Sequence, residues 1–311
     1  MGLLTRINYM KSAKYWIIFS LILSVIGLGA LGFWGLNLGI DFTGGKMIDV
    51  QFKKELPAKQ VEDALSDVVG KNISVQKAQV KGGETGSEWF VRTPELTEET
   101  RAKMLDTFKK LDENYKLISE DDVSGAVSSE LATKAGLALA IAAALQILYI
   151  TFRFEFKFGI TGVVALVHDF IITIGLLAVL RVQINSAFVA AILTVLGYSM
   201  NDTVVVIDRI RENLKFRKKG ESLEAMTTRS IQEVITRSLY TGVSVQAMLL
   251  SMLIFGGDTI WDFAMTLLIG VTSGTYSSIF IASALWLFWH QWEDSKKPTK
   301  AKKGSTKPAR A

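Results

Sequence analysis

The stretch LGYSMNDTVVVIDRIREN, Leu196 to Asn213, places ionisable groups inside a long apolar run that begins at Phe188. That run is long enough to cross a membrane, so Asp202 lies within a predicted span, with the polar Asn201 beside it. An aspartate near the centre of a span costs roughly 2.5 to 3.5 kcal/mol, and such groups usually belong to an ion or proton pathway. A structural acid tied to a neighbouring helix is the alternative interpretation of Asp202.

The composition is that of a polytopic membrane protein. The chain has 311 residues, 49% hydrophobic side chains and a mean hydropathy of +0.30, which is too apolar for an ordinary soluble enzyme. It has no cysteine and only two histidines, so we predict no disulfide, no metal site and no other cofactor. The net charge of +5 comes from short loops and a basic tail, which we expect to contact solvent or anionic lipid and no nucleic acid.

Six apolar runs predict six transmembrane helices, each long enough for a hydrocarbon core of about 30 Å. The first lacks the short apolar core and small-residue cleavage site of a signal peptide, so we interpret it as an uncleaved span. The predicted spans are Tyr15–Trp34, Thr133–Phe152, Phe158–Leu180, Phe188–Ile207, Leu239–Phe255 and Phe263–Trp289.

Loop charges predict the orientation of these spans. Nearly all loop lysines and arginines outside the large domain lie in residues 1–14, 153–157, 208–236 and 290–311, whereas the opposite short loops carry only Arg181. Because basic loops stay in the cytoplasm, both termini are predicted to be cytoplasmic. Spans two to six then occupy residues 133–289, and the tail is 290–311.

Two helical patterns belong to the predicted membrane region. Residues 221–236 carry an imperfect apolar stripe, which predicts a helix lying at the membrane surface. In the sixth span, small residues recur at intervals of four, which allows close approach of another helix, either within this chain or on a partner. The stripe consists of Leu223, Met226, Ile231, Val234 and Ile235, and the small residues are Gly270, Gly274, Ser278 and Ala282.

A separate α+β domain is predicted between the first two spans, in residues 35–132. Ile48, Val50 and Phe52 alternate with polar side chains, as in a strand with one buried face. Helix caps, apolar stripes and turn residues predict the other elements. They are a helix at 57–70, strands at 73–80 and 88–93 joined by the turn KGGETGS at 81–87, a helix after Thr97, and a strand near 116–119. The order βαββαβ is ferredoxin-like.

The domain contains no nucleophile with a base, no phosphate loop and no ligand cluster, so we expect a binding or mechanical role and no enzyme activity. The stretch LNLGIDFTGG, Leu36 to Gly45, joins it to the first span. Gly44 and Gly45 are predicted to bend the chain into the first strand, and Asp41 or Thr43 to cap a turn. We favour this structural interpretation over a functional site.

Three more ionisable residues are candidates for a role in the membrane. His168 and Asp169 lie near the middle of the third span, where their hydrogen bond would stabilise packing or relay a proton. Arg237 lies at the predicted cytoplasmic end of the fifth span. Its guanidinium either reaches lipid phosphates or changes the protonation of a nearby acid.

Six strings occur in a fixed order along the chain. They are GIDFTGG at Gly39–Gly45, RFEFKFG at Arg153–Gly159, HD at His168–Asp169, GYSMNDTVVVIDRIREN at Gly197–Asn213, TRSL at Thr236–Leu239 and IGVTSGTYSSIFIAS at Ile269–Ser283. With these strings the chain resembles the SecF family, the smaller partners of SecD in bacterial protein export, over nearly its whole length. It departs from the family at VSGAVSSEL, Val123 to Leu131, where a Gly-Pro-containing entry into the second span is more usual.

The resemblance implies an accessory subunit of the Sec translocase that, with SecD, uses the proton motive force to promote preprotein movement across the bacterial cytoplasmic membrane. It implies that Asp202 and Arg237 take part in proton movement, with Asn201 beside them, and that the energy source is the proton gradient. The implied partners are SecD, the SecYEG translocon, the preprotein and membrane lipids, together with YajC and YidC.

Two other function classes fit part of the sequence. A proton-driven efflux transporter of the same resistance-nodulation-division superfamily would usually have twelve spans and far larger external domains. A non-transporting membrane scaffold would need no proton flux, so flux measurements separate it from both transporters.

Overall fold

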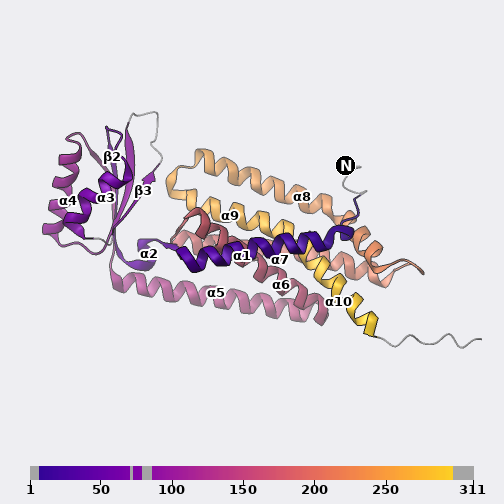
Figure 1. Ribbon diagram of the computed structural model, residues 1–311. Helices are drawn as coiled ribbons and strands as arrows, with labels where there is room; N and C mark the ends of the chain where they lie inside the picture. The colour runs from indigo at the N-terminus through magenta and orange to yellow at the C-terminus, as the bar shows by residue number, and fades with distance from the viewer. Residues whose placement is uncertain (1–6, 71–72, 79–85, 297–311) are drawn as a thin grey trace, which may run out of the picture.

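The structure is a computed structural model, and it describes residues 7–70, 73–78 and 86–296. The molecule is elongated, with an α+β domain at one end and long helices that run away from it (Figure 1). The N-terminal segment and the last helix both lie at the end opposite the domain (Figure 1). Most of the predicted turn KGGETGS and of the basic tail lies outside the described residues.

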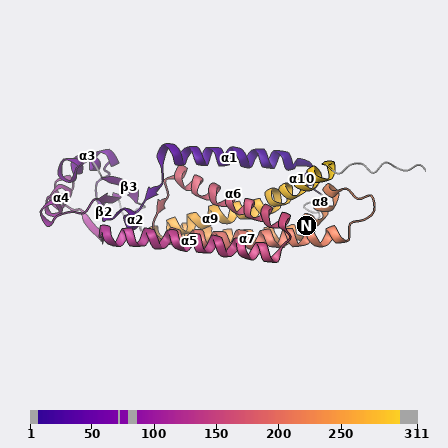
Figure 2. The ribbon, with the colours of Figure 1, turned by 90° about the horizontal axis from the view of Figure 1, so that it is seen from below.

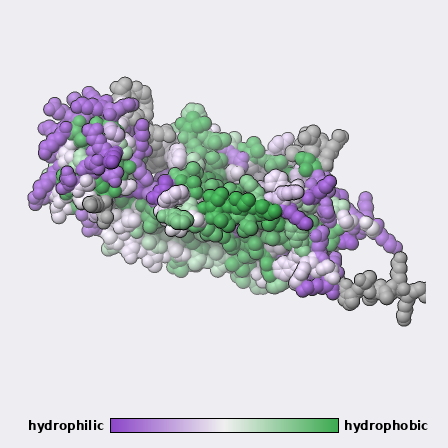
Figure 3. All heavy atoms as spheres, viewed as in Figure 1, coloured by the Kyte–Doolittle hydropathy of each residue, from purple (hydrophilic) through white to green (hydrophobic). Residues whose placement is uncertain are grey.

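Among the described residues, six helical segments are long and apolar enough to cross a membrane, which confirms the predicted number. They are α1 (Ala13–Trp34, preceded by the turn η2, Met10–Ser12), α5 (Gly125–Arg153), α6 (Phe156–Leu180), α7 (Ser186–Lys215), α8 (Leu223–Phe255), and a sixth made of α9 (Asp258–Ser277), the π-helical turn η4 (Ser278–Ala282) and α10 (Ser283–Lys296). Figure 2 shows α1 and α5 at opposite edges of the bundle. Apolar side chains cover the helices between two polar ends, as a membrane requires (Figure 3).

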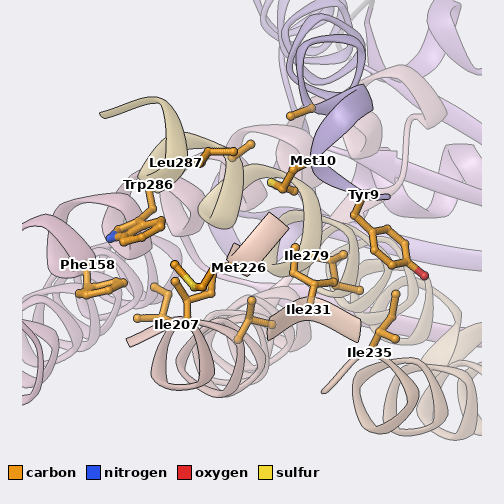
Figure 4. Packing of buried hydrophobic residues seen from close by; sticks show 14 of the residues in the cluster. Tyr9, Met10, Phe158, Ile207, Met226, Ile231, Ile235, Ile279, Trp286 and Leu287 are labelled. Atoms are coloured by element: carbon orange, nitrogen blue, oxygen red, sulfur yellow. The ribbon is translucent and has the colours of Figure 1, made fainter. Parts of the chain in front are cut away.

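The helix that we expected at the membrane surface is instead the first part of α8, which continues without a break into the fifth span. Met226, Ile231 and Ile235 are at most 2% exposed. They pack in one apolar cluster with Ile207 of α7 and Trp286 of α10 (Figure 4). The prediction was wrong because an apolar stripe suits a buried helix as well as a membrane surface.

The domain between α1 and α5 has the predicted ferredoxin-like order. Its elements are β2 (Gly45–Phe52), α3 (Ala58–Val69), β3 (Ser74–Ala78), β4 (Ser87–Thr93), α4 (Glu98–Leu111) and β5 (Lys116–Val123). The strands pair antiparallel in the order β3-β4-β2-β5. Ile48, Val50 and Phe52 are fully buried, as predicted, and they pack with Leu65 of α3 and Phe108 of α4.

The stretch LNLGIDFTGG attaches this domain to the membrane helices. It forms β1 (Asn37–Leu38), which pairs in parallel with β6 (Gln183–Ile184), and the short helix α2 (Ile40–Thr43). Asp41 accepts a hydrogen bond at 2.6 Å from the backbone N–H of Ser186, in the first turn of α7. Gly45 has a φ of +107°, and a Cβ there would lie 2.2 Å from the carbonyl oxygen of Thr93. The glycine bend is confirmed, and the contact with α7 is new.

An ion-pair cluster joins β2, α4 and β5. Glu120 accepts hydrogen bonds from Nε and Nη2 of Arg101 at 2.7 and 2.6 Å, and Nζ of Lys46 lies 3.3 Å away. The bonds to Arg101 lower the pKa of Glu120 from 4.5 to about 2, although burial acts in the opposite direction. Because the folded-state pKa is lowered, this contribution to stability is present above the unfolded pKa and is lost as the pH falls toward 2.

We therefore expect residues 45–123, expressed alone, to fold and to lose stability as the pH falls from about 5 to about 2. The Glu120→Gln variant should show a shallower loss across that window, measured by urea unfolding with circular dichroism. Identical pH profiles would contradict this assignment.

We also expect weak binding of unfolded polypeptide at most, so a hydrolytic or small-molecule-binding activity in the isolated domain would argue against a mechanical role.

Candidate functional site

Two aspartates lie buried in the interior of the helix bundle. Asp169 is near the middle of α6 and is 0% exposed, and Asp202 is on α7 and is 8% exposed. Charges inside a membrane span are rare and usually face other helices or water. Both aspartates face the other helices of this chain, so their neighbours define the candidate site.

Helix α9 approaches α7 closely beside these aspartates. A Cβ at Gly270 would lie 2.2 Å from Val195, and a Cβ at Gly274 would lie 2.9 Å from Ser199. Side chains larger than hydrogen would therefore separate the two helices. At these two positions, the small-residue pattern of the sixth span allows packing within the chain, one of its two predicted roles.

The carboxylate of Asp169 is surrounded by hydrogen-bond donors. Ser199 and Ser277 donate to Oδ2 at 2.5 and 2.6 Å, and Ser273 donates to Oδ1 at 2.8 Å. Nδ1 of His168 lies 3.0 Å from Oδ1. A carboxylate offers about four lone-pair sites, and these four partners fill them. Complete pairing of this kind offsets much of the cost of burying the charge.

His168 connects this cluster to α1. Its Nδ1 lies 3.0 Å from Oδ1 of Asp169, and its Nε2 is hydrogen-bonded to the hydroxyl of Ser20. Ser20 is 5% exposed on α1. The expected hydrogen bond between His168 and Asp169 is thus present, as part of a larger network that extends across four helices, α1, α6, α7 and α9.

Asp202 is bound by the π-helical turn of the last segment. Ser278, the first residue of η4, donates to Oδ2 of Asp202 at 2.5 Å. Ser277, the residue before it, donates to Asp169. Two adjacent residues of one helix therefore bind the two buried carboxylates. Single π-helical turns within α-helices occur frequently at functional sites.

Arg237 and Asn201 occupy different surroundings from the two aspartates. Both residues are exposed on the surface of this chain, on α8 and α7 respectively. Among the described residues, no hydrogen bond or ion pair joins the guanidinium of Arg237 to Asp202. The structure thus brings Asp202 and Asp169 to adjacent serines of one helical segment, and it leaves Arg237 and Asn201 exposed.

The serines are the part of the site that the sequence analysis missed. The string SGTYSS, Ser273 to Ser278, was interpreted only as small residues for packing. Its hydroxyls were the available signal, because Ser and Thr in transmembrane helices often bond across to another helix. Among the described residues, no group of three or more His, Asp or Glu side chains is arranged to hold a metal.

Comparison with known families places the chain in protein export. The family described as protein export membrane protein SecD/SecF, C-terminal, matches residues 103–292, and the SecD/SecF GG motif matches residues 29–55. The protein translocase subunit SecF of Sebaldella termitidis is 37% identical over 301 residues, which cover 97% of this chain and 96% of the relative. The SecF subunit of Alicyclobacillus acidocaldarius is 33% identical, with coverage of 97% and 99%.

Longer relatives contain the same fold as part of a larger chain. The protein translocase subunit SecDF of Bacillus subtilis is 36% identical over 284 residues, which are 91% of this chain and 38% of the relative. The crystal structure of SecDF from Thermus thermophilus, described as a translocon-associated membrane protein, superposes with a TM-score of 0.82 at 30% identity and covers 94% of this chain and 40% of that chain. This chain therefore belongs to the SecF family of protein-export membrane proteins, and it is a multi-pass translocase subunit rather than an enzyme.

Proposed function

We propose that this chain works with a SecD subunit and uses the proton motive force to promote preprotein translocation through SecYEG. The relatives named SecDF support the SecD partner, because this chain matches about 40% of such a chain with the same fold. One charge that crosses 100 mV releases roughly 2.3 kcal/mol, which is comparable to the free energy of a modest domain movement. YajC and YidC are further partners of the same proposed assembly.

The observation that carries the proposal is the pair of buried aspartates bound by adjacent serines. Each serine hydroxyl has a second acceptor on its own helix: Ser278 Oγ lies 3.1 Å from the carbonyl oxygen of Thr275, and Ser277 Oγ lies 3.3 Å from that of Gly274. A hydroxyl that turns to its own helix frees a carboxylate oxygen to bind a proton. Protonation of Asp202 therefore leaves the hydroxyl of Ser278 with an acceptor.

In this proposal, Asp202 binds and releases the proton, and Asp169 keeps accepting its hydrogen bonds. A proton binds at a lone pair that no donor occupies. Asp169 has four hydrogen-bond partners, whereas among the described residues Asp202 has one, Ser278. Asp202 also lies next to Asn201, which is exposed to a potential SecD helix. His168 and Asp169 then hold the network in place or relay a proton toward α1.

The location of basic residues supports cytoplasmic termini. The described N-terminal segment and α10 lie at the end opposite the domain, near the loop between α7 and α8 (Figure 1). That loop contains Arg217, Lys218 and Lys219, whereas the short connection after α6 contains Arg181. The positive-inside rule places the basic end in the cytoplasm and the α+β domain on the outer side of the bacterial cytoplasmic membrane.

Reconstitution tests the proposed function directly. Vesicles that contain SecYEG, SecD and this chain should show preprotein translocation that rises when a proton gradient is imposed, together with a proton flux that depends on this chain. Translocation without any proton flux would indicate a scaffold. Drug accumulation in the same vesicles, with no effect on preprotein, would indicate an efflux transporter instead.

Substitution of Arg237 separates coupling from anchoring. Lysine keeps the charge and reaches lipid phosphates equally well, but it lacks the planar fork of the guanidinium. If Arg237 acts on a proton-carrying acid in the assembled complex, Arg237→Lys should reduce gradient-stimulated translocation severalfold at unchanged subunit levels. Normal translocation by this variant would assign Arg237 to lipid anchoring.

A further inference from the structure

A cavity of about 530 Å³ lies between the α+β domain and the adjacent ends of the membrane helices. Two arginines line it, Arg92 of β4 and Arg181 at the end of α6, together with Thr43 and Ser74. No aspartate or glutamate belongs to its lining in the part of the chain that the structure describes. The cavity thus combines two positive charges with no carboxylate in its wall.

Arg92 is buried without an ionic partner. Its side chain donates to neutral oxygens only: those of Asn37 at 3.1 Å, Leu38 at 3.2 Å and Gln183 at 3.2 Å, and that of Gln76. Arg92 is 7% exposed, and its Nε is buried with no hydrogen-bond partner. No carboxylate lies within ion-pair distance among the described residues. Arginine is rarely buried to this extent unless it is paired, because an uncompensated buried charge is costly.

Arg181 adds a second cation, and only some of its guanidinium N–H groups donate hydrogen bonds. Nη1 donates to the carbonyl oxygens of Trp34 and Gly35 at 3.0 and 3.2 Å, and a guanidinium has five N–H donors in total. Burial lowers the pKa of Arg92, the charge of Asp262 raises it, and the charge of Arg181 lowers it by a smaller amount. Both arginines line the cavity and give it a positive charge.

We propose that this cavity binds a phosphate group through the guanidinium of Arg181, with the buried charge of Arg92 nearby, and that a phospholipid headgroup of the leaflet on the domain side supplies the phosphate. Guanidinium groups match phosphate oxygens in charge and geometry. The cavity lies beside the end of α1, where Trp34 is 64% exposed, and tryptophan is typical of the membrane interface. Leu36 and Leu38 in the lining suit the glycerol and the first acyl carbons of a lipid.

The test uses the full chain, purified in a neutral maltoside detergent, and measures binding by isothermal titration calorimetry. The probes are a short-chain phosphatidylglycerol, the corresponding diacylglycerol without phosphate, and inorganic phosphate. Arg181→Asn removes one cation, and asparagine tolerates the left-handed backbone at this position, where φ is +55°. Lys59→Gln, at an exposed lysine of α3, is the control with the same loss of charge.

We expect saturable binding of phosphatidylglycerol to the wild-type chain and none of diacylglycerol. Arg181→Asn should weaken binding on the order of tenfold, as expected for the loss of one charge-assisted contact. Lys59→Gln should leave it unchanged. Near-ultraviolet circular dichroism of each variant verifies that it is folded.

The remaining outcomes separate the sources of the phosphate. Inorganic phosphate that binds with the same dependence on Arg181 would support the site with a free ion as its ligand. Absence of binding by either phosphate compound, or equal weakening in Lys59→Gln, would overturn the proposal. The titration needs no proton gradient, so its result does not depend on proton coupling at Asp202.

Discussion

Replacement of Asp202 by asparagine should abolish the stimulation of preprotein translocation by a proton gradient. The substituted side chain keeps an oxygen that accepts from Ser278, which lies 2.5 Å from Oδ2 of Asp202. It loses the titratable proton and removes a charge whose burial in a span costs roughly 2.5 to 3.5 kcal/mol. Assembly should therefore persist or improve, while translocation in vesicles with SecYEG and SecD falls to its level without a gradient.

Asp208→Asn is the matched control, since it makes the same substitution on the same helix in a side chain that is 45% exposed. It should retain most of the stimulation, because an exposed ion pair such as that of Asp208 with Arg211 contributes little. Full stimulation by Asp202→Asn at matched subunit levels would assign Asp202 to a structural role. Loss of stimulation in both variants would show that the assay reports helix charge rather than the buried site.

The Gly175→Leu variant should lose the packing of α1 against α6. A Cβ at position 175 would lie 2.5 Å from Cα of Gly27 and 3.0 Å from its carbonyl carbon, so the two backbones are in direct contact. Backbone atoms of two helices cannot yield as the end of a flexible side chain can. Overpacking typically costs 1 to 3 kcal/mol, and we expect roughly 3 kcal/mol or more at this contact.

Thermal unfolding of the purified chain in detergent, followed by tryptophan fluorescence, measures this effect. Gly136→Leu on α5 is the control, because a Cβ there meets no atom within 4 Å. The control should unfold at the wild-type temperature, and Gly175→Leu should unfold at a clearly lower one. Equal unfolding temperatures would mean that α1 packs against α6 differently.

Local patterns in the sequence were sufficient to predict the elements and their order. Uninterrupted apolar runs predicted the six spans because the bilayer requires a minimum helix length. Alternation at Ile48, Val50 and Phe52, with helix caps and turns, predicted the βαββαβ domain because one face of each element must be buried. The boundaries were less accurate: α5 begins at Gly125, whereas the predicted span began at Thr133.

The partners of Asp169 and Asp202 were decided only by the tertiary structure. Ser199, Ser273 and Ser277 come from two helices that are far from Asp169 in the chain, and their hydroxyls converge because glycines let α9 approach α7. The same kind of long-range contact buried the apolar stripe of α8 and the guanidinium of Arg92. The sequence by itself determined which segments form helices, strands and spans, since those depend on neighbouring residues and on the surrounding solvent. Which buried charges share donors and which face a cavity depended on how distant helices pack, and no local pattern in the sequence encodes that.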